Sequence, residues 1–260
     1  LVFLIEQIDD TVRTPEDLEN FRGVPVLGFG PDISARRHAG NRSSYKAMVT
    51  ALEPDSSAIE AYRNIRTGLF FAPETENMKL LLVTSAGPGD GKTTTASNLA
   101  LVIAQSGKRV LLIDADFRRP RVHKIYGLDP AIGFSSILQN KCSLEEAVQK
   151  SVHDLEIIEN LDILPAGPTP PNPTELLESP LVPQLLADWK MKYDRVIIDT
   201  PPVLFVSDTS ILSTLSDGVI IVVRSAKRTR AHATRALKQI EKVKGRVIGG
   251  ILNGVKVSRM

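Results

Sequence analysis

One stretch of the chain, residues 85–95, most restricts what the chain can fold into. It reads Ser-Ala-Gly-Pro-Gly-Asp-Gly-Lys-Thr-Thr-Thr and lies between an apolar run, residues 79–84, and a helix-forming run, residues 96–104. Glycines let the backbone approach an anion closely, and the following helix directs its partial positive charge to the same place. A glycine-rich turn between a strand and a helix is therefore the context of a phosphate-binding loop.

Within this loop, Lys92 is placed to neutralise the β- and γ-phosphates of a nucleotide, and the Thr93 hydroxyl to hold Mg²⁺. The residues expected to contact the nucleotide are Gly87, Gly89, Asp90, Gly91, Lys92, Thr93 and Thr94. The strict pattern G-x-x-x-x-G-K-[ST] has glycine where this chain has Ala86, and the flanking strand and helix compensate for that departure. The alternative interpretation is a glycine-rich turn that only joins a strand to a helix.

The composition is that of an ordinary soluble globular protein, with 42% hydrophobic and 24% charged residues among 260. The 32 basic and 30 acidic residues leave a formal net charge of +2, so no overall field attracts nucleic acid, and we expect no nucleic-acid partner. The single cysteine, Cys142, excludes an internal disulfide framework and is expected to be a small, partly buried apolar residue.

We expect two parts in the chain. Residues 1–55 form an N-terminal segment and a linker, and residues 56–260 form the main domain. The chain begins Leu-Val-Phe-Leu-Ile without an initiator methionine, which suggests a piece of a longer polypeptide. These five residues are either the end of a transmembrane helix or a short strand. Residues 31–55 are polar and basic and predict a solvated linker, with contact to a membrane surface as the alternative.

Apolar runs alternate with helical patterns along the rest of the chain. This alternation predicts a doubly wound α/β fold with a mainly parallel sheet and helices on both faces. The expected strands are residues 79–84, 109–116, 155–158, 161–164, 193–199, 219–223 and 247–252, and residues 23–30 form a short extended segment. The expected helices are residues 56–72, 143–150, 174–178 and 229–243, with a further helix start at residues 14–17.

Three carboxylates, Asp114, Asp116 and Asp199, fall at the ends of predicted strands. In an open parallel sheet the ligand lies outside the carboxyl ends of the strands, so these acids should converge on the phosphate loop. Mg²⁺ prefers oxygen ligands and bridges phosphates to carboxylates. The three acids therefore predict a site for a magnesium nucleotide, and the alternative for each is a helix cap or turn residue.

Two further features fall near the same edge. Asn253 closes the last predicted strand, where an amide can pair with the edge of a base. The segment after Asp116 is locally basic, and its charged residues are Arg118, Arg119, Arg121, His123 and Lys124. This basic segment is either a solvated face or a site for an anion or an acidic substrate.

Three motifs together resemble those of the bacterial tyrosine kinases (BY-kinases), the cytoplasmic kinase modules of exopolysaccharide co-polymerases. Residues 85–93 resemble the Walker A motif of that family. Residues 111–120 (Leu-Leu-Ile-Asp-Ala-Asp-Phe-Arg-Arg-Pro) and 196–202 (Val-Ile-Ile-Asp-Thr-Pro-Pro) resemble its A′ and B motifs. The resemblance covers nearly the whole chain, and residues 1–55 resemble the juxtamembrane segment that follows the second transmembrane helix in fused members.

The resemblance implies a P-loop fold, the cofactors ATP and Mg²⁺, and transfer of phosphate to protein tyrosines in the regulation of exopolysaccharide or capsule polymerisation and export. The implied catalytic residues are Lys92, Asp114, Asp116 and Asp199. Of these, Asp114 would be the general base toward the tyrosine hydroxyl. Thr93, Asp116 and Asp199 would hold the metal, and Asn253 would read adenine.

The resemblance also implies partners. Glu60, Arg63 and Arg66 match the E-x-x-R-x-x-R oligomerisation motif of a homo-oligomeric ring, although an intrahelical Glu60–Arg63 pair is the alternative. The other implied partners are the transmembrane and periplasmic co-polymerase region, a protein tyrosine phosphatase and a tyrosine-rich C-terminal tail. That tail is missing here, so we expect the acceptor tyrosines to lie after Met260. The implied location is the cytoplasmic face of the bacterial inner membrane.

Two other functions fit the same loop. A partition or septum-positioning ATPase transfers phosphate only to water, but those proteins carry an extra lysine near Ala86 or Gly87, and this chain has none there. The other is an assembly module that binds a nucleotide to control oligomerisation without kinase activity.

Overall fold

The computed structural model describes residues 11–12, 17, 24–32, 57–71, 75–153, 156–227 and 230–255. The predictions for residues 1–5, for the helix start at residues 14–16 and for most of the linker lie outside these ranges. Among the described residues, no helix is both long and apolar enough to cross a membrane.

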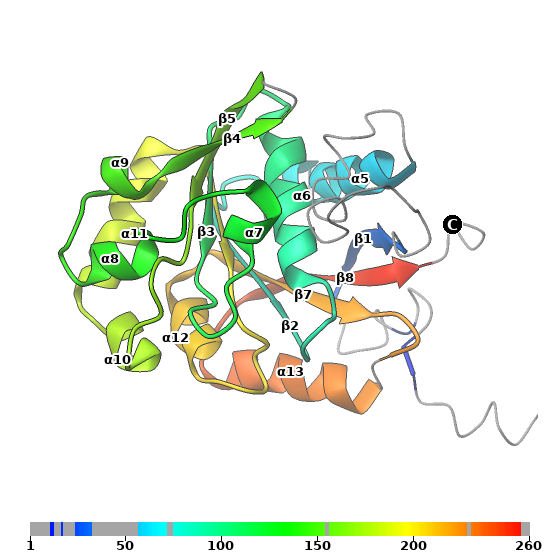
Figure 1. Ribbon diagram of the computed structural model, residues 1–260. Coiled ribbons are helices and arrows are strands. Elements are labelled where there is room, and N and C mark those ends of the chain that lie inside the picture. The colour runs from blue at the N-terminus through cyan, green and yellow to red at the C-terminus, as the bar shows by residue number, and fades with distance from the viewer. Residues whose placement is uncertain are drawn as a thin grey trace, which may run out of the picture.

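The described part of the chain forms one eight-stranded sheet in the order β1-β8-β7-β2-β6-β3-β5-β4 (Figure 1). All neighbouring strands are parallel except β4 and β5. The predicted doubly wound, mainly parallel fold is confirmed. The strands are β1 (Val26–Pro31), β2 (Leu80–Ser85), β3 (Val110–Asp114), β4 (Gln149–His153), β5 (Glu156–Leu164), β6 (Arg195–Asp199), β7 (Gly218–Arg224) and β8 (Val247–Val255).

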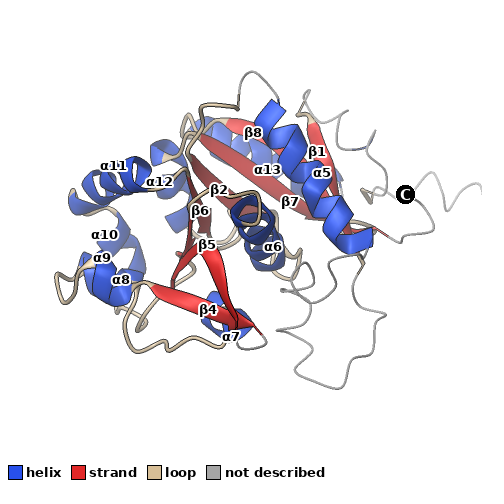
Figure 2. Cartoon of the chain, turned by 90° about the horizontal axis from the view of Figure 1, so that it is seen from above, coloured by secondary structure: helices blue, strands red, loops and turns tan. Residues whose placement is uncertain are grey.

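The helices cover both faces of the sheet, and Figure 2 shows α11 and α12 on the side away from α6. The described helices are α5 (Ser57–Phe71), α6 (Lys92–Ala104), α7 (Val122–Tyr126), α8 (Phe134–Leu138), α9 (Leu144–Ala147), α10 (Pro173–Leu177), α11 (Leu181–Lys192), α12 (Asp208–Leu215) and α13 (Arg230–Lys242).

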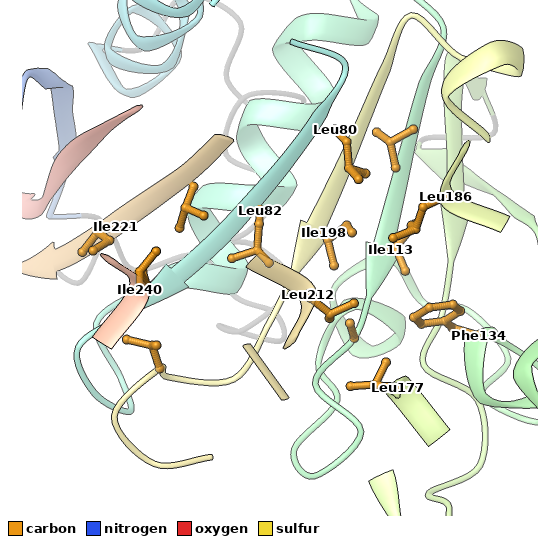
Figure 3. Close-up of a cluster of buried hydrophobic side chains, with 14 of the residues drawn as sticks. Leu80, Leu82, Ile113, Phe134, Leu177, Leu186, Ile198, Leu212, Ile221 and Ile240 are labelled. Carbon is orange, nitrogen blue, oxygen red and sulfur yellow. The ribbon is translucent and has the colours of Figure 1, made fainter. Parts of the chain in front are cut away.

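Both faces of the central strands are buried because successive side chains of a strand point to opposite sides. In β2, Leu80 and Leu82 pack with residues of α11, α12 and α13, and Figure 3 shows this cluster. Leu81 and Val83 pack instead with residues of α5 and α6. This double burial explains why the strands read as continuous apolar runs in the sequence.

The predictions between residues 143 and 164 are partly wrong. The predicted helix at residues 143–150 ends at Ala147, where the chain enters β4. Ser143 caps this short helix by accepting a hydrogen bond from the Glu146 N–H. The two strands predicted at residues 155–158 and 161–164 are one strand, β5, because Asn160 turns through a positive φ of 60° without ending it.

The edge strand β1 lies in the segment that was predicted to precede the main domain, where residues 23–30 were expected to be extended. It pairs in parallel with β8, with Gly30 opposite Asn253. β8 also runs three residues further than predicted, to Val255, so Asn253 lies within the strand instead of closing it. Residues 26–31 thus fold with the sheet, and the division at residue 55 is otherwise still a prediction.

The apolar cluster between the sheet and α11 gives a test of the fold. Trp189 of α11 is 2% exposed and packs edge-on against Phe134, 5.8 Å between ring centroids. Trp189→Ala should lower the free energy of unfolding by about 3–5 kcal/mol in urea denaturation. Met191→Ala, on the same helix but at an 80% exposed position, is the matched control and should change it by less than about 0.5 kcal/mol. Equal effects of the two substitutions would contradict this packing.

Candidate active site

The phosphate loop follows β2, which lies between β7 and β6 near the middle of the sheet. Gly89 and Gly91 adopt positive φ angles of 79° and 98°, as a loop of this kind requires, whereas Gly87 is not among the positive-φ glycines. The Gly87 N–H donates to Asp90 Oδ2 at 2.9 Å. The buried Asp90 carboxylate therefore shapes the loop, and the assignments of Gly87 and Asp90 to the nucleotide stay predictions.

Asn253 joins the phosphate loop to the edge of the sheet. Its Nδ2 donates to the Asp90 carbonyl at 2.7 Å, and its side chain is 5% exposed. A Cβ added at Gly91 would lie 1.8 Å from Asn253 Nδ2, and one added at Gly30 would lie 2.4 Å from Asn253 Oδ1. Two glycines thus make room for this amide. Its predicted contact with adenine is untested.

Lys92 is the centre of the charged cluster. Its Nζ donates to Asp116 Oδ2 at 2.9 Å and lies 3.6 Å from Asp199 Oδ1 and 3.3 Å from Thr93 Oγ1. Burial disfavours the charged amine, but attraction by Asp199 and Asp116 outweighs it and raises the pKa of Lys92. The lysine is therefore held as a cation at the start of α6.

Asp199 is a buried carboxylate whose hydrogen-bonding capacity is unused. Both of its carboxylate oxygens are buried, and neither has a hydrogen-bond partner among the described residues. Burial raises the pKa of Asp199 to about 6, against the opposing attraction of Lys92. A buried carboxylate with unused oxygens, next to the Thr93 hydroxyl and Asp116, supplies the hard oxygen donors that Mg²⁺ prefers. The residues present fit that ion.

Asp114 is held more tightly than its neighbours. Its Oδ2 accepts from the N–H groups of Arg121 and Val122, both at 3.0 Å, and its Oδ1 accepts from the Asp116 N–H at 3.1 Å. Burial, together with repulsion by Asp199, raises the pKa of Asp114 to about 7. The predicted strand to residue 116 ends instead at Asp114, so Asp116 lies in the turn that Asp114 fixes.

A pocket of about 340 Å³ opens over these residues. Of the predicted site residues it is lined by Gly89, Gly91, Lys92, Thr93, Thr94, Asp116 and Asn253. Asp114 and Asp199 lie beneath it, fully buried. Two residues that were not predicted, Asp32 and Arg224, also line the pocket, and they form an ion pair at 3.4 Å. Asp32 follows β1 and Arg224 ends β7. Because ligands bind at the carboxyl ends of parallel strands, this position could have indicated both residues from the sequence.

The proposed oligomerisation residues make contacts within the chain. Arg63 pairs with Glu60 one turn away on α5, as the alternative interpretation of the motif expects. Arg66 Nη1 donates to the Val102 carbonyl of α6 at 2.9 Å. An intersubunit role for the three residues stays a prediction.

Comparisons with known proteins agree with the geometry. A family model described as "AAA domain" matches residues 78–251. Tyrosine-protein kinase YwqD of Bacillus subtilis is 43% identical over 227 residues, which are 87% of this chain and 93% of that protein. The kinase domain of Escherichia coli tyrosine kinase ETK superposes with a TM-score of 0.82 at 34% identity, covering 95% of this chain and 96% of that chain.

This chain belongs to the bacterial tyrosine-protein kinase family. It spans nearly all of YwqD but only about a third of the length of several longer kinases that it also matches. The septum site-determining protein MinD of Pyrococcus horikoshii, solved with Mg-ADP, has a TM-score of 0.57 over 67% of this chain and 23% identity. That similarity reflects the shared fold, and its TM-score is well below that for the ETK kinase domain.

The raised pKa values of the buried acids predict that the stability of this domain depends on pH. A carboxyl whose pKa is higher in the folded than in the unfolded state favours folding below the unfolded value, 3.8 for Asp114, and loses that advantage as the pH rises through about 7. Its shift corresponds to roughly 4 kcal/mol. We therefore expect Asp114→Asn to gain stability relative to the parent chain by about that amount between pH 4 and pH 8.

Urea denaturation without Mg²⁺ at several pH values measures this difference. The control is Asp188→Asn on the exposed face of α11, which should keep a constant difference from the parent. A pH-independent difference for Asp114→Asn would mean that Asp114 does not have a raised pKa.

Proposed function

We propose that this chain transfers the γ-phosphoryl group of ATP to tyrosine hydroxyls of proteins. The observation that carries the proposal is the position of Lys92 at the phosphate loop, within 4 Å of both Asp116 and Asp199. Phosphoryl transfer depends mainly on positioning and on charge neutralisation, and this cluster supplies both. Membership of the tyrosine-protein kinase family supports tyrosine as the acceptor.

The position of each residue in the pocket indicates its role in the reaction. The loop amides at Gly89 and Gly91 face the phosphates, and Lys92 neutralises charge on the group in transfer. Thr93, Asp116 and Asp199 would hold Mg²⁺, which would supply positive charge to offset that of the phosphates. Asp32, Arg224 and Asn253 line the other part of the pocket and would face the base.

Asp114 is proposed as the general base toward the acceptor. A pKa of about 7 allows a carboxyl to take up and release a proton near neutral pH, which suits a base. Its three backbone N–H partners use both acceptor sites of Oδ2 and one of Oδ1, so one site on Oδ1 is left to take up a proton. Asp114→Asn should therefore reduce kcat far more than ATP affinity, and an equal loss of both would assign it a structural role.

We further propose the roles that the longer relatives suggest. In a membrane-bound co-polymerase, the domain would lie at the cytoplasmic face, assemble as a ring and phosphorylate a tyrosine-rich tail in trans, with a phosphatase reversing the reaction. Such cycles would regulate the polymerisation and export of exopolysaccharide or capsule. Transfer in trans is supported by the poor placement, as acceptors, of the tyrosines that the structure describes. Tyr62 and Tyr126 are buried, and the Tyr193 hydroxyl is bonded to Asp162.

A labelling assay tests the kinase. The chain is incubated with γ-labelled ATP, Mg²⁺ and a tyrosine-rich peptide, and label on tyrosine is separated from free phosphate. We expect label on the peptide, and Lys92→Met should lower it at least ~100-fold because a phosphate-neutralising charge is lost. Lys108→Met, an exposed lysine before β3, is the matched control. Free phosphate as the sole product would favour an ATPase switch, and nucleotide-dependent assembly without turnover would favour an assembly module.

A sedimentation experiment tests the ring. Replacing Glu60, Arg63 and Arg66 with alanine should shift the profile toward monomer, because the three spaced residues present one charged stripe on α5. The control is Asn64→Ala, an exposed position of the same helix. Melting curves of both variants exclude a loss of folding, since Arg66 also bonds α6. An unchanged profile for the triple variant would limit the three residues to contacts within the chain, which are the Glu60–Arg63 pair and the bond from Arg66 to α6.

A further inference from the structure

Three arginines follow Asp116 in the sequence, and the structure gives them different surroundings. Arg118 turns toward α12, where its Nε donates to Oδ2 of the fully buried Asp208 at 3.1 Å. Its Nη2 also donates to Thr174 Oγ1 at 3.2 Å. Arg118 therefore fastens the segment to the body of the domain.

Arg119 and Arg121 line the pocket instead. Both are exposed, and neither guanidinium has a hydrogen bond or ion pair with another residue of the described ranges. Their backbones are fixed, because the Arg119 N–H donates to Asp116 Oδ1 at 3.0 Å and the Arg121 N–H donates to Asp114 Oδ2. The acids of the site thus hold the turn that carries two solvent-facing cations.

The other cations that line this pocket have carboxylate partners. Lys92 pairs with Asp116 and lies near Asp199, and Arg224 pairs with Asp32. Arg119 and Arg121 thus add two exposed positive charges to the pocket lining, and neither has a carboxylate partner among the described residues. Guanidinium groups of this kind suit carboxylate or phosphate groups, which they bind in a bidentate manner.

The direction of the reaction indicates which anion they meet. The acceptor oxygen approaches in line, from the side opposite the leaving oxygen, and thus from the side away from the phosphate loop. The segment with Asp116, Arg119 and Arg121 approaches the pocket from β3 instead of from the phosphate loop on β2. Resting on the proposed kinase function, we propose that Arg119 and Arg121 select acceptor segments that carry acidic side chains beside the tyrosine.

The test compares two peptides of equal length. One has glutamates on both sides of a single tyrosine, and the other has glutamines at those positions. With the 260-residue chain, kcat/KM for the acidic peptide should be about five- to tenfold higher, as expected for two exposed charge pairs. The preference should weaken as salt is raised, because exposed charges are screened.

Variants assign the preference to the two residues. Arg119→Gln with Arg121→Gln should reduce the ratio between the peptides to about one and leave KM for ATP unchanged. Arg119→Lys with Arg121→Lys should retain most of it. Lys108→Gln is the matched control, because it removes an exposed positive charge that does not line the pocket, and its ratio should stay at the value of the parent chain.

Three outcomes overturn the proposal. They are equal labelling of both peptides by the parent chain, a ratio unchanged in the double glutamine variant, and an effect of that variant confined to KM for ATP, which would assign the arginines to the nucleotide. Each leaves tyrosine phosphorylation intact. A chain that labels neither peptide refutes the kinase function itself, so the two failures are distinguishable.

Discussion

The site depends on one electrostatic arrangement, the ammonium of Lys92 held among buried carboxylates at the carboxyl edge of a parallel sheet. Asp116 and Asp199 raise the pKa of the lysine, and the lysine in turn offsets part of the cost of burying Asp199. Neighbouring parallel strands bring these groups together, since β3 pairs with β6 and Asp114 lies opposite Asp199. The sheet therefore has to form before the site exists.

The site is also costly to the fold. Burial raises the pKa of both Asp114 and Asp199, and neither oxygen of Asp199 accepts a hydrogen bond from the described part of the chain. A bound cation would offset the buried negative charge of Asp199. Because only the folded chain forms this site, binding of the cation would also raise the free energy of unfolding. The large apolar clusters on both faces of the sheet supply stability that offsets the cost of burying these carboxylates.

The phosphate loop is fixed from two directions. Within the loop, Asp90 binds the Gly87 N–H, and from the sheet edge Asn253 binds the Asp90 carbonyl. Because Asn253 also packs against Gly30 of β1, the edge strand, β8 and the phosphate loop form one connected unit. A change in the pairing of β1 would reach the nucleotide pocket through this amide.

The sequence by itself determined the fold class, the phosphate loop and the acids at the strand ends, because buried parallel strands and glycine-rich turns have local patterns. It did not determine which of these groups touch one another. The pairing of Arg118 with Asp208 and of Arg224 with Asp32 joins residues far apart in the chain, and so does the pairing of β1, a predicted extended segment, with β8. Only the tertiary structure decided these contacts, because strand order and packing, not local propensity, set which side chains meet.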